Sequence, residues 1–280
     1  MIVDGSESSL KKFLSDLPPV DQVGADSRAA MLATRSIKTT SKAWAIDMAI
    51  SMVDLTTLEG ADSAGKVKAL CAKAVRPDPT DLAVPSVGAI CVYNDMVKIA
   101  RTELNLIGGK DIAVAAVATA FPSGRASIAV KKLDTQDAID AGANEIDMVI
   151  DRGAFLSGQL GEVFEEIKII KQLCGEKAHL KVILETAALT DEQIAKACQR
   201  CESAGADFVK TATGFHPAGG ADVRAIKIMH ETVGGRLGVK ASGGIRNIEF
   251  ATELINAGAT RLGLSSSRAI LDGVAATGSY

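Results

Sequence analysis

Eight short apolar segments, separated by stretches with helical periodicity, constrain the fold of this 280-residue chain more than any other feature. They begin about 23 to 40 residues apart, the spacing of strand–helix–strand units. This alternation predicts an α/β protein with a (β/α)8 barrel, or TIM barrel. An open doubly wound sheet is the alternative, but no Gly-x-Gly-x-x-Gly follows the first segment. The expected strands are Ile50–Leu55, Ala89–Val92, Ile112–Ala118, Glu145–Ile150, Leu180–Glu185, Asp207–Thr211, Leu237–Ala241 and Arg261–Leu264.

Two of the intervening helices carry clear end signals. Thr190 begins a capping box, and Gly205 is expected to end the helix that follows it. Asn247 is expected to cap a helix over Ile248–Ala257, which Gly258 ends.

The chain ahead of the first strand is expected to form an N-terminal helical extension. Residues 1 to about 25 are predicted to be a loosely packed arm, followed by one helix from Arg28 to about Asp47. The predicted domains are therefore an arm and helix over residues 1–46 and a barrel over residues 47–280.

Composition narrows the classes of function. The net charge of −3, with both signs mixed along the chain, favours neither a nucleic-acid nor a membrane partner. No apolar run approaches the ~18 residues of a membrane-spanning helix. The polar N-terminus lacks the apolar centre of a signal peptide. A cytoplasmic enzyme is the expectation.

Cysteine and histidine are too few and too scattered to predict a metal site. The five cysteines are an odd number, which argues against a disulfide framework. Cys198 and Cys201 form a CxxC, but both fall on an apolar helical stripe with Ile194 and Ala204, so we expect them to pack in the core. The sequence contains only three histidines. No metal and no cofactor is expected.

Three charged residues interrupt expected buried strands. Asp147, Lys210 and Lys240 each lie among apolar neighbours, although charged side chains are rarely buried without a partner. In a barrel, alternate residues of a strand point inward and the active site lies at the carboxyl ends of the strands. The alternation places all three charges inside the barrel, with Glu145, Lys181 and Glu185 on the same side.

Two inward lysines on neighbouring strands suit imine chemistry. An amine must lose its proton before it attacks a carbonyl, and a free lysine has a pKa near ~10.4. Two ammonium groups ~5 Å apart at an effective dielectric constant of ~20 repel by roughly 3 kcal/mol, which is about two pKa units. The sequence therefore predicts that Lys240 lowers the pKa of Lys210, while Asp147 transfers protons or pairs with the lysine that stays charged.

The segments after the last two strands predict a phosphate site. Barrels often bind phosphate with the loops that follow strands seven and eight. These loops contain Ser242-Gly243-Gly244 and Ser265-Ser266-Ser267. Glycines let backbone N–H groups approach an anion, and the serine hydroxyls add donors. Simple turn and helix-cap chemistry is the alternative interpretation of either loop alone.

The sequence from about Asp47 to the C-terminus resembles the deoxyribose-phosphate aldolases. The similarity rests on Val53-Asp54-Leu55-Thr56-Thr57-Leu58, Glu145-Ile146-Asp147, Phe208-Val209-Lys210-Thr211-Ala212-Thr213-Gly214, Val239-Lys240-Ala241-Ser242-Gly243-Gly244-Ile245-Arg246 and Ser279-Tyr280. The resemblance implies a metal-independent class I aldolase. Such an enzyme interconverts 2-deoxy-D-ribose 5-phosphate with acetaldehyde and D-glyceraldehyde 3-phosphate through a lysine Schiff base.

The resemblance also implies roles for individual residues. Lys210 would form the imine, Lys240 would lower its pKa, and Asp147 would be the acid/base. Asp54 and Thr213 would hold the sugar, while the phosphate would face Gly214, Gly243, Gly244, Ser265 and Ser266. Tyr280, the last residue, would relay a proton to the substrate carbon. A frayed terminus is the alternative for Tyr280.

The sequence departs from the family pattern at three positions. Ala212 stands where many members have serine, Phe215 where some have a lysine that can reach the phosphate, and Ala241 where others have proline. These differences leave the imine chemistry intact and make the strength of phosphate recognition uncertain.

The sequence leaves two alternative functions open and is compatible with more than one oligomeric state. Another Schiff-base sugar-phosphate aldolase or a transaldolase would use a donor larger than acetaldehyde. A catalytically silent barrel would serve as a binding or scaffold protein. The expected partners are a sugar phosphate and small aldehydes, and the N-terminal extension is compatible with a homo-oligomer, a dimer or tetramer.

Overall fold

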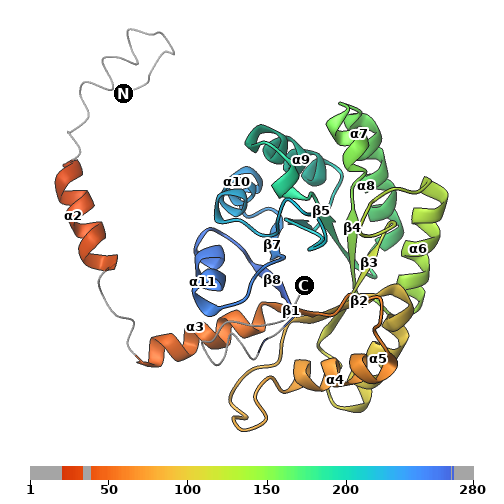
Figure 1. The fold of residues 1–280 in the computed structure, drawn as a ribbon, viewed down its shortest axis with the longest axis horizontal. Coiled ribbons are helices and arrows are strands. Elements are labelled where there is room, and N and C mark those ends of the chain that lie inside the picture. The colour runs from red at the N-terminus through yellow and green to blue at the C-terminus, as the bar shows by residue number, and fades with distance from the viewer. Residues whose placement is uncertain (1–20, 34–38, 266, 268–280) are drawn as a thin grey trace. The chain divides into compact units, whose positions relative to one another are not determined.

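Eight parallel strands close into a barrel in chain order, from β1 to β8 and back to β1 (Figure 1). The computed structural model describes residues 21–33, 39–265 and 267. The strands are β1 (Val53–Thr56), β2 (Ala89–Tyr93), β3 (Ala113–Ala118), β4 (Glu145–Val149), β5 (His179–Ile183), β6 (Phe208–Lys210), β7 (Gly238–Ser242) and β8 (Arg261–Leu264). The predicted (β/α)8 barrel is confirmed, and the open-sheet alternative is wrong.

Helices follow the strands and surround the barrel (Figure 1). The α-helices of the barrel are α4 (Ala64–Val75), α5 (Val97–Leu106), α6 (Ile128–Asp140), α7 (Arg152–Leu156), α8 (Leu160–Cys174), α9 (Asp191–Ser203), α10 (Val223–Val233) and α11 (Ile248–Asn256), with short 3₁₀ turns η1 (Asn94–Met96) and η2 (Thr186–Ala188). The capping box at Thr190 and the Asn247 cap are both present. These local signals fixed the helix starts because they satisfy the first free backbone N–H groups.

The segment ahead of β1 differs from the prediction. Two helices occupy it, α2 (Gln22–Ala33) and α3 (Thr39–Ser51), with residues between them outside the described part of the chain. Helix α2 starts within the expected arm, because the Asp21 side chain accepts a hydrogen bond from Gly24 N at 2.8 Å and so caps it. Ile50 and Ser51 belong to α3 rather than to the first strand, since Met52 N still bonds to Met48 O in helical fashion.

The chain separates into a unit from Met1 to Ala43 and a unit from Trp44 to Tyr280. The second unit contains the whole barrel, and everything described below lies within it. The division at residue 46 remains a prediction.

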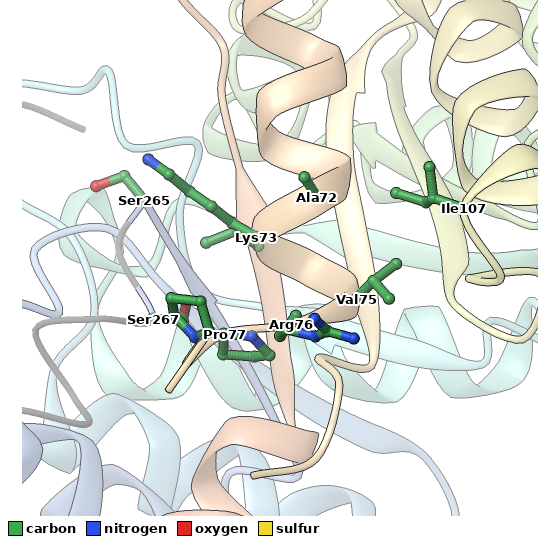
Figure 2. Close-up of a pocket in the computed structure, with 10 residues that line it drawn as sticks. Ala72, Lys73, Val75, Arg76, Pro77, Ile107, Ser265 and Ser267 are labelled. Atoms are coloured by element: carbon green, nitrogen blue, oxygen red, sulfur yellow. The ribbon is translucent and has the colours of Figure 1, made fainter. Parts of the chain in front are cut away.

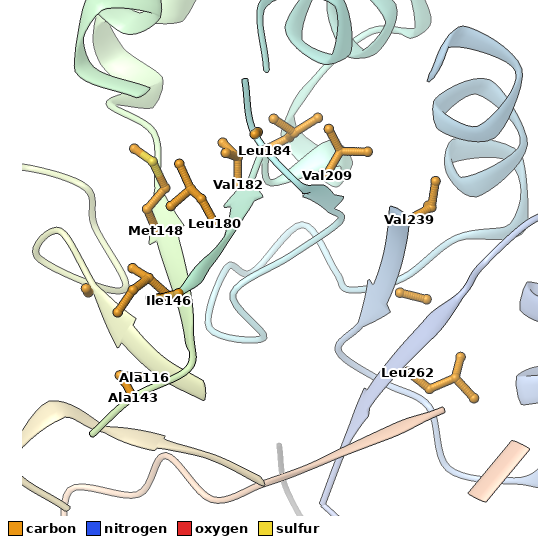
Figure 3. Packing of buried hydrophobic residues seen from close by; sticks show 14 of the residues in the cluster. Ala116, Ala143, Ile146, Met148, Leu180, Val182, Leu184, Val209, Val239 and Leu262 are labelled. Atoms are coloured by element: carbon orange, nitrogen blue, oxygen red, sulfur yellow. The ribbon is translucent and has the colours of Figure 1, made fainter. Parts of the chain in front are cut away.

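Residues alternate between two layers along each strand. On β4 and β5, the apolar side chains Ile146, Met148, Leu180 and Val182 are fully buried and group against the helices (Figure 3). The residues between them face the barrel interior, where Asp147 and Lys181 meet. The predicted alternation is confirmed on both strands, because a pleated strand sends successive side chains to opposite faces.

Candidate active site

The strand register brings the charged residues of the interior to one level. Lys210 of β6 lies directly beside Lys240 of β7, and Asp147 of β4 beside Lys181 of β5. Parallel pairing fixes these neighbours, since a slip of one residue would turn each charge into the apolar layer. Three charges predicted from separate strands are therefore brought together.

The carboxylate of Asp147 joins the two predicted lysines. Its Oδ2 accepts a hydrogen bond from Lys210 Nζ at 2.8 Å and one from Lys240 Nζ at 2.7 Å. Its Oδ1 accepts from Lys181 Nζ at 2.9 Å. The two lysines thus contact one carboxylate oxygen rather than facing each other across an empty site, and all four side chains are fully buried.

A second set of charges lies beneath this group. Lys181 Nζ also binds Asp54 Oδ2 at 3.1 Å and Glu145 Oε2, and Lys240 Nζ binds Asp54 Oδ2. Arg261 Nη1 donates to Asp54 Oδ1 at 2.6 Å. The sequence assigned no role to Glu145, Lys181 or Arg261, although strand alternation had already placed the first two inside. Asp54 lies inside the ionic network.

Electrostatics in this network differ from the two-lysine prediction. Burial lowers the pKa of Lys210, but the charge of Asp147, its hydrogen bond with Lys210 and the nearby Cys91 together outweigh that lowering, so the net direction is upward. Burial raises the pKa of Asp147, yet Lys181, Lys210 and Lys240 together hold it well below its usual range. The sequence argument counted repulsion by Lys240 and burial, which both lower the pKa of Lys210. In the structure Asp147 lies between the two lysines and opposes that lowering, so the effect of Lys240 on Lys210 stays a prediction.

The loop after β6 is tied to β5. Thr213 N and Thr213 Oγ1 donate to the two oxygens of Glu185, at 3.1 and 2.7 Å, and Arg152 Nη1 donates to Glu185 Oε2 at 2.6 Å. Thr213 and Glu185 are fully buried. Gly214, next along the loop, has φ +89°, a conformation that glycine adopts without strain. Glu185 and Arg152 were not assigned a role from the sequence.

Glycines bring the loops after β6 and β7 into contact. A methyl group added to Gly243 would lie 3.0 Å from Gly220 Cα and 3.5 Å from Gly214 Cα, and Ala221 N donates to Gly243 O at 2.9 Å. Gly243 and Gly244 both have positive φ, at +86° and +79°. Gly220 was missed, although the pair Gly219-Gly220 just ahead of a helix cap was a readable signal.

Ser242 and the serines after β8 have different surroundings. The Ser242 hydroxyl donates to Ala212 O at 2.7 Å and so links the two loops directly. Ser265 is exposed and, with Ser267, lines a hollow of about 700 Å³ beside α4 (Figure 2). Figure 2 shows Lys73 and Arg76 of the α4 end in the same hollow. Ser266 and Tyr280 lie outside the described residues.

The structure describes all three positions at which the sequence departs from the family pattern. Ala212 and Ala241 are fully buried. Phe215 has 49% of its surface exposed and stacks edge to face on Phe121, with ring centroids 5.6 Å apart. Tyr93 packs on the other side of Phe121 at 6.2 Å. Position 215 therefore presents an aromatic ring and no positive charge.

The cysteines take the packing role that the sequence predicted. Cys198 and Cys201 are buried in the core with Ile194, and all five cysteines are free thiols. Burial raises the pKa of Cys198 to about 12. In the described part of the chain, no three His, Cys, Asp or Glu side chains gather in a way that could hold a metal ion.

Several known proteins with similar sequences or folds are aldolases. The sequence model of the DeoC/LacD family aldolases matches residues 48–273. Deoxyribose-phosphate aldolase of Kocuria rhizophila is 45% identical over 80% of this chain and 95% of its own length, and that of Nocardia farcinica is 51% identical over 66% and 79%. The tetrameric deoxyribose phosphate aldolase of Aeropyrum pernix superposes with a TM-score of 0.70 at 26% identity, covering 84% of this chain and 97% of its own. The chain therefore belongs to the DeoC/LacD family of aldolases.

Proposed function

We propose that the chain cleaves 2-deoxy-D-ribose 5-phosphate reversibly to acetaldehyde and D-glyceraldehyde 3-phosphate through an imine on Lys210. The observation that carries the assignment is the shared Asp147 Oδ2, which accepts from Lys210 and Lys240 at 2.8 and 2.7 Å. A carboxylate at hydrogen-bond distance from the nucleophile can take up and return its protons.

The charge balance of the buried network favours one neutral lysine. Four cationic side chains, Lys181, Lys210, Lys240 and Arg261, face three carboxylates, Asp54, Glu145 and Asp147. Burial disfavours an unpaired charge, so the loss of one proton from a lysine leaves a neutral network.

The lysines differ in how firmly carboxylates hold them. Lys181 binds Asp54, Glu145 and Asp147, whereas Lys240 binds Asp54 and Asp147. Among the described residues, the carboxylate partner of Lys210 is Asp147 alone. Asp147, Asp54 and Glu145 raise the pKa of Lys181 well above its usual value, against the lowering by burial. Lys210 is therefore the lysine of the three with the fewest carboxylate partners, which supports it as the nucleophile.

The proposed reaction runs in four steps. Neutral Lys210 Nζ attacks C1 of the open-chain sugar, and loss of water gives the iminium. A base, which we assign to Asp147, takes the proton of the C3 hydroxyl as the C2–C3 bond breaks, releasing glyceraldehyde 3-phosphate. The bonding electrons pass to the iminium and form an enamine. Protonation at C2 and hydrolysis then release acetaldehyde and free Lys210.

The remaining site residues belong to the same proposal. Asp54 and Thr213 hold the sugar, while Gly214, Ser242, Gly243, Gly244, Ser265 and Ser266 form the phosphate end. Tyr280 protonates or deprotonates C2. Deletion of Tyr280 is expected to slow turnover by about 10²-fold while the imine on Lys210 still forms. Wild-type turnover in the truncated protein would remove Tyr280 from the mechanism.

Imine trapping tests the assignment. We expect borohydride with acetaldehyde to add one reduced two-carbon adduct, which peptide mapping places on Lys210. An adduct on Lys240 or Lys181 would contradict the assignment. A panel of larger carbonyl donors distinguishes a transaldolase or another sugar-phosphate aldolase, and the absence of any adduct would favour a silent barrel. Activity is expected to survive EDTA.

Assembly and location complete the proposal. We propose a homo-oligomer, a dimer or a tetramer. The large exposed side chains Val130 and Leu133, three residues apart on α6, support it, since grouped apolar surface often marks an interface. Light scattering on the full chain measures the mass. We also place the enzyme in the cytoplasm. Among the described residues, no helix has the length and apolar character needed to cross a bilayer.

A further inference from the structure

Glu185 is a buried carboxylate that the imine chemistry does not use. It lies two residues beyond the end of β5 and is fully buried, with φ +61° and ψ +57°. This left-handed conformation is costly for a residue with a side chain and persists only where the surroundings enforce it. Thr119 and Ala120, after β3, also have positive φ values. The described non-glycine residues with positive φ therefore all follow strands, at the carboxyl end of the barrel.

The backbone ladder ends just where the bonds of Glu185 begin. Leu184 N donates to Lys210 O, Thr186 N to Thr211 O, and Thr211 N to Lys240 O, so backbone bonds hold β6 as far as Thr211. Beyond that point, Glu185 Oε1 accepts from Thr213 N at 3.1 Å and Glu185 Oε2 from Thr213 Oγ1 at 2.7 Å. Two different supports therefore hold the lysine and the turn that follows it.

The Thr213 hydroxyl also connects Glu185 to the backbone of Phe215, two residues further along the chain. Thr213 Oγ1 gives its proton to Glu185 and accepts from Phe215 N at 3.1 Å. The turn from Thr213 to Phe215, with Gly214 at its centre, is thereby fixed by one carboxylate. Gly214 in turn packs against Gly243, as the 3.5 Å approach of an added methyl group shows.

Arg152 holds the carboxylate in place. Its Nη1 donates to Glu185 Oε2 at 2.6 Å, and its side chain is 22% exposed while that of Glu185 is fully buried. Arg152 begins α7, directly after the Asp151 cap that follows β4. A chain of contacts thus runs from the end of β4 through β5 and the β6 loop to the β7 loop.

We infer that Glu185, held by Arg152, is a positioning residue that sets the shape of the phosphate-binding end of the site through Thr213. The inference rests on the proposed function, because it takes the Gly214 and Gly243 loops as the phosphate end. Glu185 acts on substrate only through these loops. Its loss therefore weakens use of the phosphorylated sugar more than use of the same sugar without phosphate.

The test compares kcat/KM for 2-deoxyribose 5-phosphate with kcat/KM for 2-deoxyribose. Glu185→Gln keeps the shape of the side chain and removes its charge, so one of the two Thr213 donors loses its acceptor. We expect a loss of about 10²-fold on the phosphorylated sugar, carried mainly by KM, because small misplacements of a binding loop have effects of that size. On the unphosphorylated sugar we expect a change of less than about threefold.

Three further variants keep the test decisive if Glu185→Gln does not fold. Thr213→Val removes a hydroxyl that the proposed function also uses to hold the sugar, so kcat/KM is expected to fall on both sugars and to fall more on the phosphorylated one. Thr213→Ser keeps both donors and is expected to keep the wild-type ratio. Arg152→Met, which leaves Glu185 without its cation, is expected to act in the same direction. Where Glu185→Gln does fold, its combination with Thr213→Val is expected to lower the ratio no further than the larger single effect, since both changes act along one path.

A matched control separates positioning from loss of stability. Glu166 of α8 pairs with the buried Lys131 of α6 at 2.5 Å, on the helical layer. Glu166→Gln is expected to lower the unfolding temperature and leave the substrate ratio unchanged.

Equal losses on both sugars, or additive losses in the double variant, would overturn the inference. Borohydride trapping of acetaldehyde on Lys210 in the Glu185→Gln protein separates this outcome from failure of the proposed function, which would abolish trapping in the wild type as well.

Discussion

Neighbouring residues of β5 are equally buried but are stabilised by opposite means. On β5, Leu180 and Val182 face the helices and Lys181 faces the interior, and all three are fully buried. The outer layer gains stability from apolar area removed from water, about 25 cal/mol per Å². The inner layer has to recover the cost of burying its charges through close pairing. Apolar residues of similar volume would often serve stability as well, so we attribute the retained charges to the imine chemistry.

The largest expected effect separates the layers at neighbouring residues of β6. Lys210→Ala removes the proposed nucleophile and is expected to abolish turnover and acetaldehyde trapping. Val209→Ala, one residue away in the outer layer, is expected to lower stability and keep trapping. Steady-state assays and mass spectrometry measure both. Turnover in Lys210→Ala near the wild-type rate would contradict the imine mechanism.

The next effect concerns stability and its dependence on pH. Lys181→Met leaves Asp54, Glu145 and Asp147 with less compensation and is expected to cost about 3–5 kcal/mol at pH 7. Leu180→Ala is expected to cost about 2–5 kcal/mol. Size alone will not distinguish them.

The pH dependence of stability is expected to distinguish Lys181→Met from Leu180→Ala. The pKa of Asp54 and that of Asp147 are lowered in the fold, for Asp54 by Lys181, Lys240 and Arg261 against the raising by burial. The stability that these two carboxylates contribute is therefore fully present above the unfolded pKa of about 3.9 and is lost as the pH falls toward their folded pKa values. Removing Lys181 raises the folded pKa values, so the difference from wild type should shrink in acid. The deficit of Leu180→Ala should stay constant in urea titrations, and parallel behaviour of the two variants would refute the ionic account.

A third effect is on the pH–rate profile. Lys240→Leu removes one of the cations that hold Asp147, so Asp147 acts more strongly on Lys210 and raises its pKa. We expect the alkaline shift to be about one pH unit. Val239→Ala, the outer neighbour on β7, is the control and is expected to leave the profile unmoved. A Lys240→Leu profile that overlays the wild type would show that Lys240 does not tune Lys210.

The smallest effect is expected in the helical layer. Burial raises the pKa of the Cys198 thiol to about 12, so the thiol should resist alkylation in the folded protein. Cys198→Ala is expected to cost about 1 kcal/mol of unfolding free energy and to leave kcat/KM unchanged. Rapid labelling of Cys198 at pH 7, or zinc-dependent activity, would instead favour a reactive or metal-binding thiol.

The sequence by itself determined the barrel and the layer in which residues of β4 to β7 lie. Strand–helix alternation, the cap signals at Thr190 and Asn247, and the period of two along β4 are local properties, so they can be read without knowing the fold. For the same reason the inward side of Asp147, Lys210 and Lys240 was predictable. The early start of α2 and the end of α3 were not, because each depends on a few marginal hydrogen bonds at a helix end.

Only the tertiary structure decided which charges meet. That Asp147 Oδ2 lies between Lys210 and Lys240, and that Lys181 and Arg261 share their carboxylates, follows from strand register around the closed barrel. The same holds for Glu185, whose donors, Arg152 and Thr213, come from residues 33 and 28 positions away. Electrostatic energy depends on distances of a few ångströms between residues far apart in sequence. The sequence therefore predicted an imine-forming site, whereas the direction of the Lys210 pKa shift required the fold.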